Sequence, residues 1–426
     1  MKLLIKGGHL TDPANSIDRE ADLLIEDGLI TAVKKGISAK GADQVIEADG
    51  FKVLPGFIDL HTHLREPGYE YKEEVATGVK AAVAGGFTAV CCMANTLPVA
   101  DTSAVLELIL AQAGRANLAK VYPIGAITKG LKGQEISEMQ ALAAAGAIGF
   151  SDDGRGVQNS RVMRMAMQYS RIGDWLLLLH EEDDALAEDG QMHEGFYSTY
   201  YGLRGIPDLA EDIMVKRDIA LAADTGARVH FCHVSTAGSL RAIKEAKTRG
   251  LRVTCEVTPH HLTLTDEMLG SYDSSYKVNP PLRSGEHVEA LINGLADGSI
   301  DAIATDHAPH DLEVKHCEFA QAANGISGLE TAVAVVVDQL VKTGILSWGR
   351  LAELMSTNPA KIIGVTPPAL IAGGTADITI IDPQKNKKVD VSQFNSKGKN
   401  NPYQGREMTG WPVATIVNGQ LVYYQR

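Results

Sequence analysis

Eight short runs of apolar or β-branched residues, each followed by a longer segment of helical pattern, alternate between Gly56 and about Asp306. The runs read FIDLHTH, FTAVCCMANT, VYPIGAIT, AIGFSDD, WLLLLHEED, RVHFCHV, LRVTCEVTP and DAIATDHAP. Such alternation predicts βαβ units joined in a parallel sheet. Eight units are the number that closes a (β/α)8 barrel. We therefore predict an α/β fold with a TIM barrel over residues 55–365.

The two ends of the chain have a different residue pattern. Short strands separated by turns occupy residues 1–54, and the same pattern returns over residues 366–426. We expect these two segments to pair into one small β-sandwich domain beside the barrel.

Charge and cysteine content exclude several classes of protein. The formal net charge is −13, so the chain lacks the basic footprint expected for binding nucleic acid or an anionic membrane. No apolar run reaches the roughly 18 residues that span a bilayer, and the first residues do not resemble a signal peptide. The five cysteines form no CxxC pair, which is typical of a reducing compartment, and we expect a cytoplasmic protein.

Polar side chains stand at the ends of several apolar runs, where a barrel has its active-site face. They are His61 and His63 after the first run, Asp152 and Asp153 after the fourth, His180 after the fifth, His233 after the sixth, and Asp306, His307 and His310 after the eighth. Burying four imidazoles and two carboxylates together without a partner would be costly, which predicts a metal site. Six such groups exceed the needs of one tetrahedral ion and fit two ions that share a bridging carboxylate.

The spacing of these residues adds detail at the first strand. His61 and His63 are two residues apart, so their side chains lie on one face of the strand. Asp59 shares that face, and we expect it to support His61. Arg65 follows the pair at once, which predicts an anionic ligand held beside the metal. Spacing alone does not separate Asp152 from its neighbour as the bridging carboxylate.

Several motifs together resemble the bacterial class I dihydroorotases of the amidohydrolase superfamily. They are PGFIDLHTHLREPG, MANT, GFSDDG, LLLLHEED, FCHVSTAGS, EVTPHHL, NPPLR, ATDHAPH and NGISGLET, and the resemblance covers almost the whole chain. It implies two Zn2+ ions per subunit. His61 and His63 would bind the first ion and His180 and His233 the second, with Asp153 bridging them together with a hydroxide.

The resemblance also implies the catalytic and substrate-binding residues. Asp306 would be both a ligand of the first ion and the general acid and base. The residues expected to bind the substrate are His63, Arg65, Asn95, Asn279, His310, Asn324 and Gly325. Of these, Arg65, Asn95 and His310 would hold the substrate carboxylate.

The implied activity is the reversible cyclisation of N-carbamoyl-L-aspartate to (S)-dihydroorotate and water, a step of pyrimidine biosynthesis that uses a metal-activated hydroxide. The expected partners are this small-molecule substrate, a second copy in a homodimer, and aspartate carbamoyltransferase. Two alternatives stay open. Hydantoinases and allantoinases share the HxH motif, but normally carry a lysine where this chain reads FSDDG. A non-catalytic scaffold for the carbamoyltransferase would have lost metal ligands, which this chain keeps.

Overall fold

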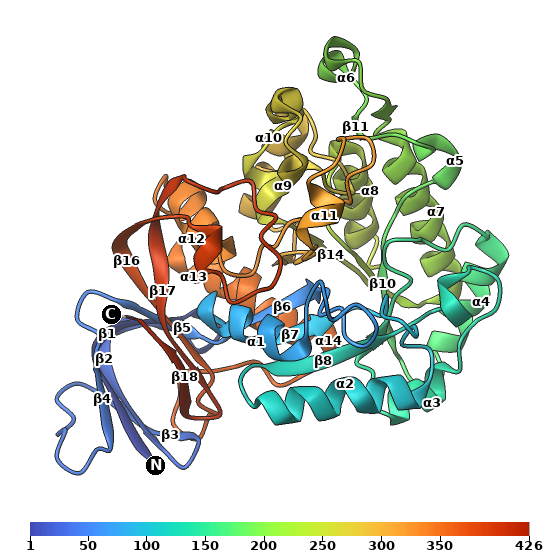
Figure 1. Cartoon of the computed structure of the whole chain (residues 1–426). Coiled ribbons are helices and arrows are strands. Elements are labelled where there is room, and N and C mark those ends of the chain that lie inside the picture. The colour runs from blue at the N-terminus through green and yellow to red at the C-terminus, as the bar shows by residue number, and fades with distance from the viewer. Residues whose placement is uncertain (426) are drawn as a thin grey trace.

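A barrel of eight parallel strands forms the centre of the molecule, as predicted (Figure 1). The computed structural model describes residues 1–425. Each strand pairs with the next in chain order, from β6 to β15. The strands are β6 (Phe57–Thr62), β7 (Phe87–Cys92), β8 (Lys120–Gly125), β9 (Gly149–Phe150), β10 (Leu176–Leu179), β13 (Arg228–Phe231), β14 (Val253–Val257) and β15 (Ala302–Ile303). All eight match the apolar runs of the sequence, and only β8 begins one residue earlier, at Lys120.

The barrel closes between its first and last strands through a short, irregular set of contacts. Thr62 pairs in parallel with His307, and the His63 amide donates to the His307 carbonyl at 2.9 Å. Below this point the Thr305 amide donates to the Asp59 carboxylate at 3.0 Å. This seam places the end of β6, with its two histidines, directly beside the residues that follow β15.

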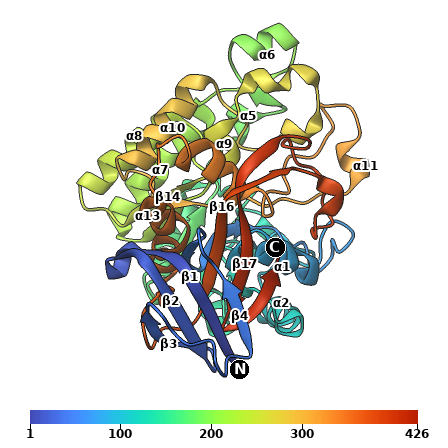
Figure 2. The ribbon, with the colours of Figure 1, turned by 90° about the vertical axis from the view of Figure 1, so that its left-hand side faces the viewer.

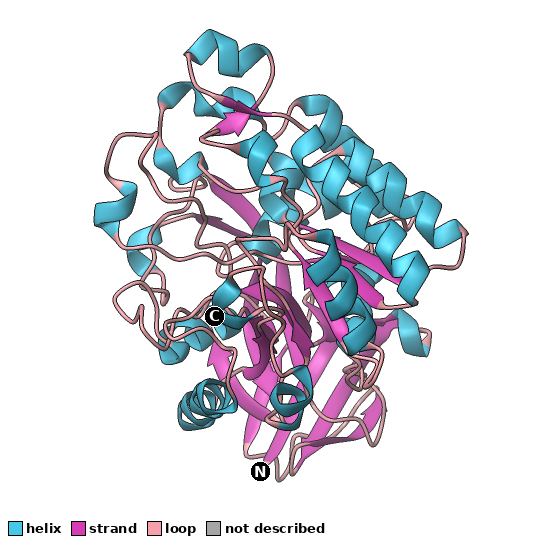
Figure 3. Cartoon of the chain, turned by 90° about the vertical axis from the view of Figure 1, so that its right-hand side faces the viewer, coloured by secondary structure: helices cyan, strands magenta, loops and turns pink. Residues whose placement is uncertain are grey.

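Helices follow the strands and cover the outside of the barrel (Figure 3). The helix after each strand, in order, is α1 (Val75–Ala84), α2 (Ser103–Ala116), α3 (Met139–Ala144), α4 (Ser160–Ser170), α7 (Leu209–Thr225), α8 (Ala237–Thr248), α10 (Gly285–Ala296) and α12 (Ala332–Val336). Every residue of β6, β7 and β10 is buried. This burial on both faces explains why β7 and β10 read as nearly continuous apolar runs without alternation.

Shorter elements lengthen the loops at the carboxyl ends of the strands. Between β10 and α7 lie α5 (Asp184–Ala187), β11 (Met192–His193), α6 (Phe196–Tyr201) and β12 (Gly205–Ile206). The loops after β14 and β15 contain α9 (Pro259–Thr263) and α11 (Leu312–Lys315). Three further helical segments close the barrel region, namely α13 (Trp348–Ala352), η6 (Glu353–Thr357) and α14 (Asn358–Ile363). Among residues 1–425, no helix is long and apolar enough to cross a membrane.

The two chain ends meet in one separate sheet, as predicted (Figure 2). Its strands are β1 (Lys2–Asp12), β2 (Ile17–Glu26), β3 (Leu29–Lys34), β4 (Gln44–Glu47), β5 (Lys52–Pro55), β16 (Ile378–Lys388), β17 (Glu407–Val417) and β18 (Gln420–Tyr424). The N-terminal and C-terminal halves join where β5 pairs antiparallel with β16. Alternate side chains of both halves, including Leu23 and Ile380, share one apolar core. The domain boundaries given above remain a prediction.

Candidate metal and substrate site

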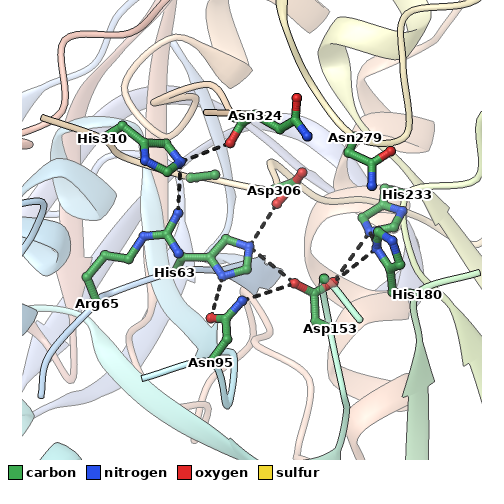
Figure 4. Close-up of a pocket in the computed structure, with 13 residues that line it drawn as sticks. His63, Arg65, Asn95, Asp153, His180, His233, Asn279, Asp306, His310 and Asn324 are labelled. Atoms are coloured by element: carbon green, nitrogen blue, oxygen red, sulfur yellow. Dashed lines mark hydrogen bonds and ion pairs between the residues drawn. The ribbon is translucent and has the colours of Figure 1, made fainter. Parts of the chain in front are cut away.

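A cavity of about 230 Å³ opens at the carboxyl ends of the barrel strands (Figure 4). The residues that line it are His63, Arg65, Asn95, Asp153, Gly154, His180, His233, Asn279, Asp306, Ala308, His310, Asn324 and Gly325. Every residue predicted to bind metal or substrate lines this cavity except His61. His61 is fully buried and contacts Asp153 and Asp306 from within the barrel.

The first group of possible metal ligands is formed by His61, His63 and Asp306. One donor atom from each lies within 4.8 Å of the others. The Asp306 Oδ1 atom is 3.1 Å from His63 Nε2 and 3.5 Å from His61 Nε2. Burial alone would raise the pKa of Asp306, but the surrounding imidazoles outweigh it and hold that pKa below its ordinary value. The carboxylate therefore stays ionised, as a metal ligand must be.

The second group is centred on Asp153. Its Oδ1 atom lies 3.3 Å from His61 Nε2, 3.5 Å from His233 Nε2 and 3.6 Å from His180 Nδ1. Its Oδ2 atom is 3.5 Å from His63 Nε2. Asp153 thus lies between all four histidines, where a carboxylate could join two ions.

Asp152 faces away from the histidines, although it is the adjacent residue. Its Oδ1 atom accepts hydrogen bonds from the amides of Ile127 at 2.8 Å and Thr128 at 2.9 Å. Asp152 therefore holds the start of the loop after β8. Burial raises its pKa to about 6. The structure separates the two carboxylates that sequence spacing left equivalent.

The donor atoms at the centre of the site fit a bound metal. Among the described residues, His61 Nε2 and Asp153 Oδ1, which lie 3.3 Å apart at the centre of the site, are buried and have no hydrogen-bond partner. Buried polar atoms without partners are uncommon and costly. Imidazole nitrogens together with carboxylate oxygens are the donor set that zinc prefers.

Two neighbouring side chains fix how the first pair of histidines presents its nitrogens. The Nδ1 atom of His61 is 3.1 Å from Glu256 Oε1, and the Nδ1 atom of His63 is 2.9 Å from Asn95 Oδ1. Both partner oxygens only accept, so each Nδ1 carries a proton and each ring turns its Nε2 toward the carboxylates of the site. This orientation of metal-binding histidines by acceptors behind them is a common arrangement.

Glu256 was not predicted, whereas Asp59 was expected to support His61. Asp59 instead accepts from the His61 backbone amide at 3.1 Å and from the Thr305 hydroxyl at 2.6 Å, so it fixes the strands and not the imidazole. Hydrogen bonds from His61 and His230 to Glu256 outweigh its burial and lower its pKa to about 2. A lone carboxylate inside the apolar run VTCEV was the available signal.

Three residues of the site adopt backbone conformations that are unusual for residues other than glycine. Arg65 has φ 63°, His233 has φ 33° and Asp306 has φ 47°. Left-handed conformations cost energy in such residues and often occur at functional sites. Each lies just after a barrel strand, where the chain must turn sharply to aim its side chain into the cavity.

The side of the cavity opposite the second histidine pair carries the positive charge of Arg65. Within residues 1–425 no carboxylate lies within ion-pair distance of its guanidinium, which donates only to the Pro309 carbonyl at 3.3 Å. The guanidinium also lies 3.4 Å from His310 Nε2. A charged group in a lined cavity with no carboxylate partner is suited to an anionic ligand.

His310 is a neutral neighbour of that arginine. Its Nε2 atom is 2.9 Å from the Asn324 carbonyl, which can only accept, so Nε2 carries the proton. Its Nδ1 atom is 3.5 Å from Lys72 Nζ. Burial, together with the charges of Arg65 and Lys72, lowers the pKa of His310 to about 2. His310 thus lies between Arg65 and the loop that contains Asn324.

The remaining predicted contacts lie on the far wall of the cavity. Asn279 donates to Glu182 at 3.2 Å, and its buried Oδ1 atom has no partner among the described residues. Gly325 has φ 139°, and a Cβ atom there would lie 2.7 Å from the Ala308 Cβ atom. Only glycine lets this loop approach Ala308 so closely.

The fold is shared with solved structures of a hydantoinase and a dihydropyrimidinase. An L-hydantoinase (dihydropyrimidinase) from Arthrobacter aurescens superimposes with a TM-score of 0.89 at 28% identity, covering 99% of this chain and 96% of that one. A dihydropyrimidinase from Brevibacillus agri has the same fold, with a TM-score of 0.85 at 24% identity over 100% and 95% of the chains. The barrel and its site therefore define a cyclic amidohydrolase.

Sequence relatives narrow this class to one family. The family model described as Dihydro-orotase-like matches residues 50–239. Dihydroorotase from Pelotomaculum thermopropionicum is 52% identical, covering 100% of this chain and 99% of that protein. Dihydroorotase from a Geobacter species is 50% identical, over 99% of both chains. The chain belongs to the dihydroorotase family.

Proposed function

We propose that this protein is a zinc-dependent dihydroorotase, which interconverts N-carbamoyl-L-aspartate and (S)-dihydroorotate. The observation that carries the proposal is the unpaired guanidinium of Arg65 beside a cluster of imidazoles and carboxylates. The cluster accounts for the hydrolysis of an amide in general. Arg65 accounts for a substrate that bears a carboxylate, because its planar group can bind that carboxylate with two hydrogen bonds.

Two zinc ions are the cofactors that this donor set supports best. His61, His63 and Asp306 would hold the first ion, and His180 and His233 the second, with Asp153 shared between them. Bound there, the ions would polarise the ring carbonyl and lower the pKa of a water molecule. The carboxylate of Asp306, which its surroundings hold ionised, is in the protonation state that such binding needs.

Asp306 is proposed as the group that moves the proton. In ring opening, its carboxylate accepts the proton of the attacking water and delivers it to the departing ring nitrogen. The carbon–nitrogen bond of the ring amide breaks, and the carbonyl carbon becomes a second carboxylate. In ring closure, Asp306 takes a proton from the carbamoyl nitrogen as that nitrogen attacks the side-chain carboxylate. It returns the proton to the carboxylate oxygen whose carbon–oxygen bond breaks, and that oxygen leaves as hydroxide and takes up a proton from solvent to give water.

The remaining wall of the cavity is proposed to orient the ring. Asn279 offers its unpartnered carbonyl oxygen to a ring N–H group. The backbone of Asn324 and Gly325 lines the same wall and offers further polar groups. These contacts would fix the ring so that its carbonyl carbon faces the metal cluster.

The two alternative functions have less support. Hydantoinases and allantoinases normally carry a lysine at the position of Asp153, and they lack the arginine clamp of the REPG motif. A non-catalytic scaffold would have lost ligands, whereas all six proposed ligands are present here and converge on one site.

We also propose a cytoplasmic homodimer. All five cysteines are free, which suits a reducing compartment. Association with aspartate carbamoyltransferase is a further hypothesis, and co-elution of the two purified proteins in size-exclusion chromatography would test it.

Metal analysis paired with dihydroorotate hydrolysis tests the proposed site. We expect the wild-type protein to bind zinc and hydrolyse dihydroorotate. Asp153→Ala removes the carboxylate shared by four histidines, so it should lose zinc and roughly 100-fold or more of the rate. Asp152→Asn is the matched control, because an asparagine oxygen can still accept from Ile127 and Thr128, and it should keep its zinc. Full zinc content and rate in Asp153→Ala would contradict the assignment.

A further inference from the structure

A loop from the terminal sheet reaches back over the barrel. Residues 395–403, which we call the C-terminal strap, lie between β16 and β17. Figures 1 and 2 show this red segment leaving the sheet and running along the barrel side of the molecule. The strap is mostly buried, with Asn400 only 5% exposed and Asn401 only 2% exposed.

The amide side chain of Asn400 makes four hydrogen bonds, two through its Nδ2 group and two through its Oδ1 atom. Its Nδ2 group donates to the Ala308 carbonyl at 3.0 Å and to the Gly325 carbonyl at 2.9 Å. Its Oδ1 atom accepts from the His310 amide at 3.1 Å and from the Ser327 hydroxyl at 2.9 Å. One buried side chain therefore bonds to both of two neighbouring chain segments, which also pair directly through the Ala308 amide and the Ile326 carbonyl.

Three of these partners belong to the wall of the cavity. Ala308, His310 and Gly325 all line it, and His310 lies beside Arg65. Ala308 also receives support from the Ile326 carbonyl, to which its amide donates at 2.9 Å. Asn400 touches no atom of the metal cluster among the contacts described for it. It acts instead on the backbone that carries the anion-binding wall.

The strap is held firmly enough to serve as a fixed support. A Cβ atom on Gly398 would lie 2.3 Å from the Ser327 hydroxyl and 2.5 Å from the Pro309 Cβ atom, so the strap packs directly on both segments. Ser396 donates its hydroxyl to Glu73, a fully buried carboxylate in the loop after β6. The strap thus contacts the two loops that supply Arg65 and His310.

We propose that Asn400 is a positioning residue for the carboxylate-binding wall of the active site. It fixes the spacing between the 308–310 and 325–327 segments, so that the substrate carboxylate meets Arg65 and its neighbours in one geometry. This inference rests on the proposed dihydroorotase function. It predicts an effect mainly on substrate binding, since the metal ligands and the proton-moving Asp306 are not touched.

Asn401 offers a matched control from the same strap. It is the same residue type and equally buried, and its Nδ2 group donates to the Ser327 carbonyl and the Thr331 hydroxyl at 3.0 Å each. Its Oδ1 atom accepts from the Tyr403 amide at 2.9 Å. None of these partners lines the cavity. Loss of Asn401 therefore removes comparable hydrogen bonds, one of them to the 325–327 segment, but leaves the bonds of Asn400 to Ala308, His310 and Gly325 in place.

The test compares Asn400→Ala, Asn400→Asp and Asn401→Ala in the zinc-loaded full-length protein. We expect Asn400→Ala to raise KM for dihydroorotate roughly 10- to 100-fold, as misplacement of binding groups does. Its kcat should change by less than about threefold, and its zinc content should equal that of wild type. Asn400→Asp should be at least as impaired, because it turns an oxygen toward the Ala308 and Gly325 carbonyls. Asn401→Ala should lower Tm with a KM within about twofold of wild type.

Hydrogen exchange of the His310 amide supplies a readout that does not depend on turnover. Exchange should be faster in Asn400→Ala and unchanged in Asn401→Ala. The proposal is overturned if KM and exchange in Asn400→Ala match wild type, or if Asn401→Ala shifts KM equally. Failure of the wild type itself to hydrolyse dihydroorotate would overturn the proposed function, while the exchange comparison would still decide whether Asn400 holds the wall.

Discussion

The guanidinium of Arg65 lies in a cavity whose carboxylates face histidines and not the arginine. The cluster and the arginine therefore have separate tasks, although His63 and Arg65 are only two residues apart in the sequence. The imidazole–carboxylate cluster suits the binding of metal and the chemistry of an amide. The arginine suits the recognition of a charged group that hydantoin and allantoin do not carry. In the proposed function, substrate choice therefore depends on Arg65 more than on the metal ligands.

Replacement of Arg65 tests this division directly. Arg65→Met should weaken dihydroorotate binding by about 2–5 kcal/mol, because it removes one partner of a desolvated charge pair. Arg65→Lys keeps the charge but not the two-pronged geometry, and it should fall between wild type and Arg65→Met. Steady-state kinetics measure the change, and zinc content should stay constant in both variants. Unchanged kcat/KM in Arg65→Met would show that another group holds the carboxylate.

The sequence predicted which residues converge on the site, but not which contacts each of them makes there. The polar ends of the apolar runs predicted the cluster, because parallel strands all end at one face of a barrel. Adjacent residues such as Asp152 and Asp153 could not be separated, since the direction of each side chain depends on the turn after β9. The support of His61 by Glu256 joins residues 195 positions apart, and no local pattern reports such a contact.

Two buried lysines hold the loop that follows β15. Lys315 donates to the carbonyls of Ala323 at 2.8 Å and Gly325 at 3.2 Å. Lys277 donates to the carbonyls of Phe319 at 2.7 Å and Ala320 at 2.9 Å. In the sequence these lysines look like ordinary solvated charges. Their burial could not be predicted, because it follows from the path of an irregular loop and not from a period of 2 or 3.6 residues.

The buried ammonium group of Lys315 predicts a particular dependence of stability on pH. Burial and the nearby charge of Lys277 lower its pKa to about 7. Between about pH 7 and pH 10 the folded protein therefore holds fewer protons at this site than the unfolded chain, so its contribution to stability rises with pH. The contribution is lost as the pH falls toward 7, where the folded form must also take up the proton.

Comparison of melting temperatures over this range tests that prediction. The difference in Tm between wild type and Lys315→Met should grow from pH 7 to pH 9. In free energy of unfolding, this growth should be at most about 1 kcal/mol per pH unit. Lys132→Met, at an exposed lysine of the barrel, is the control and should give a constant difference. A constant difference for Lys315→Met as well would mean that Lys315 is not desolvated as the structure indicates.

The whole molecule combines a regular scaffold with irregular supports. The barrel and the joined termini could be predicted, because hydrophobic periodicity reports directly on burial. The C-terminal strap could not, because Asn400 and Ala308 are 92 residues apart and are joined by one side chain in a loop. The terminal sheet therefore does more than cover the barrel. Through the strap it supports the loops that form the active-site wall.

Substrate preference of the zinc-loaded wild-type protein is the most direct measurement of the central claim. Its kcat/KM should be determined under the same conditions for dihydroorotate, hydantoin and allantoin. We expect dihydroorotate to be preferred by roughly 100-fold or more, because only dihydroorotate brings a carboxylate to the unpaired guanidinium of Arg65. A higher kcat/KM for hydantoin or allantoin, or no turnover of dihydroorotate with zinc bound, would contradict the claim.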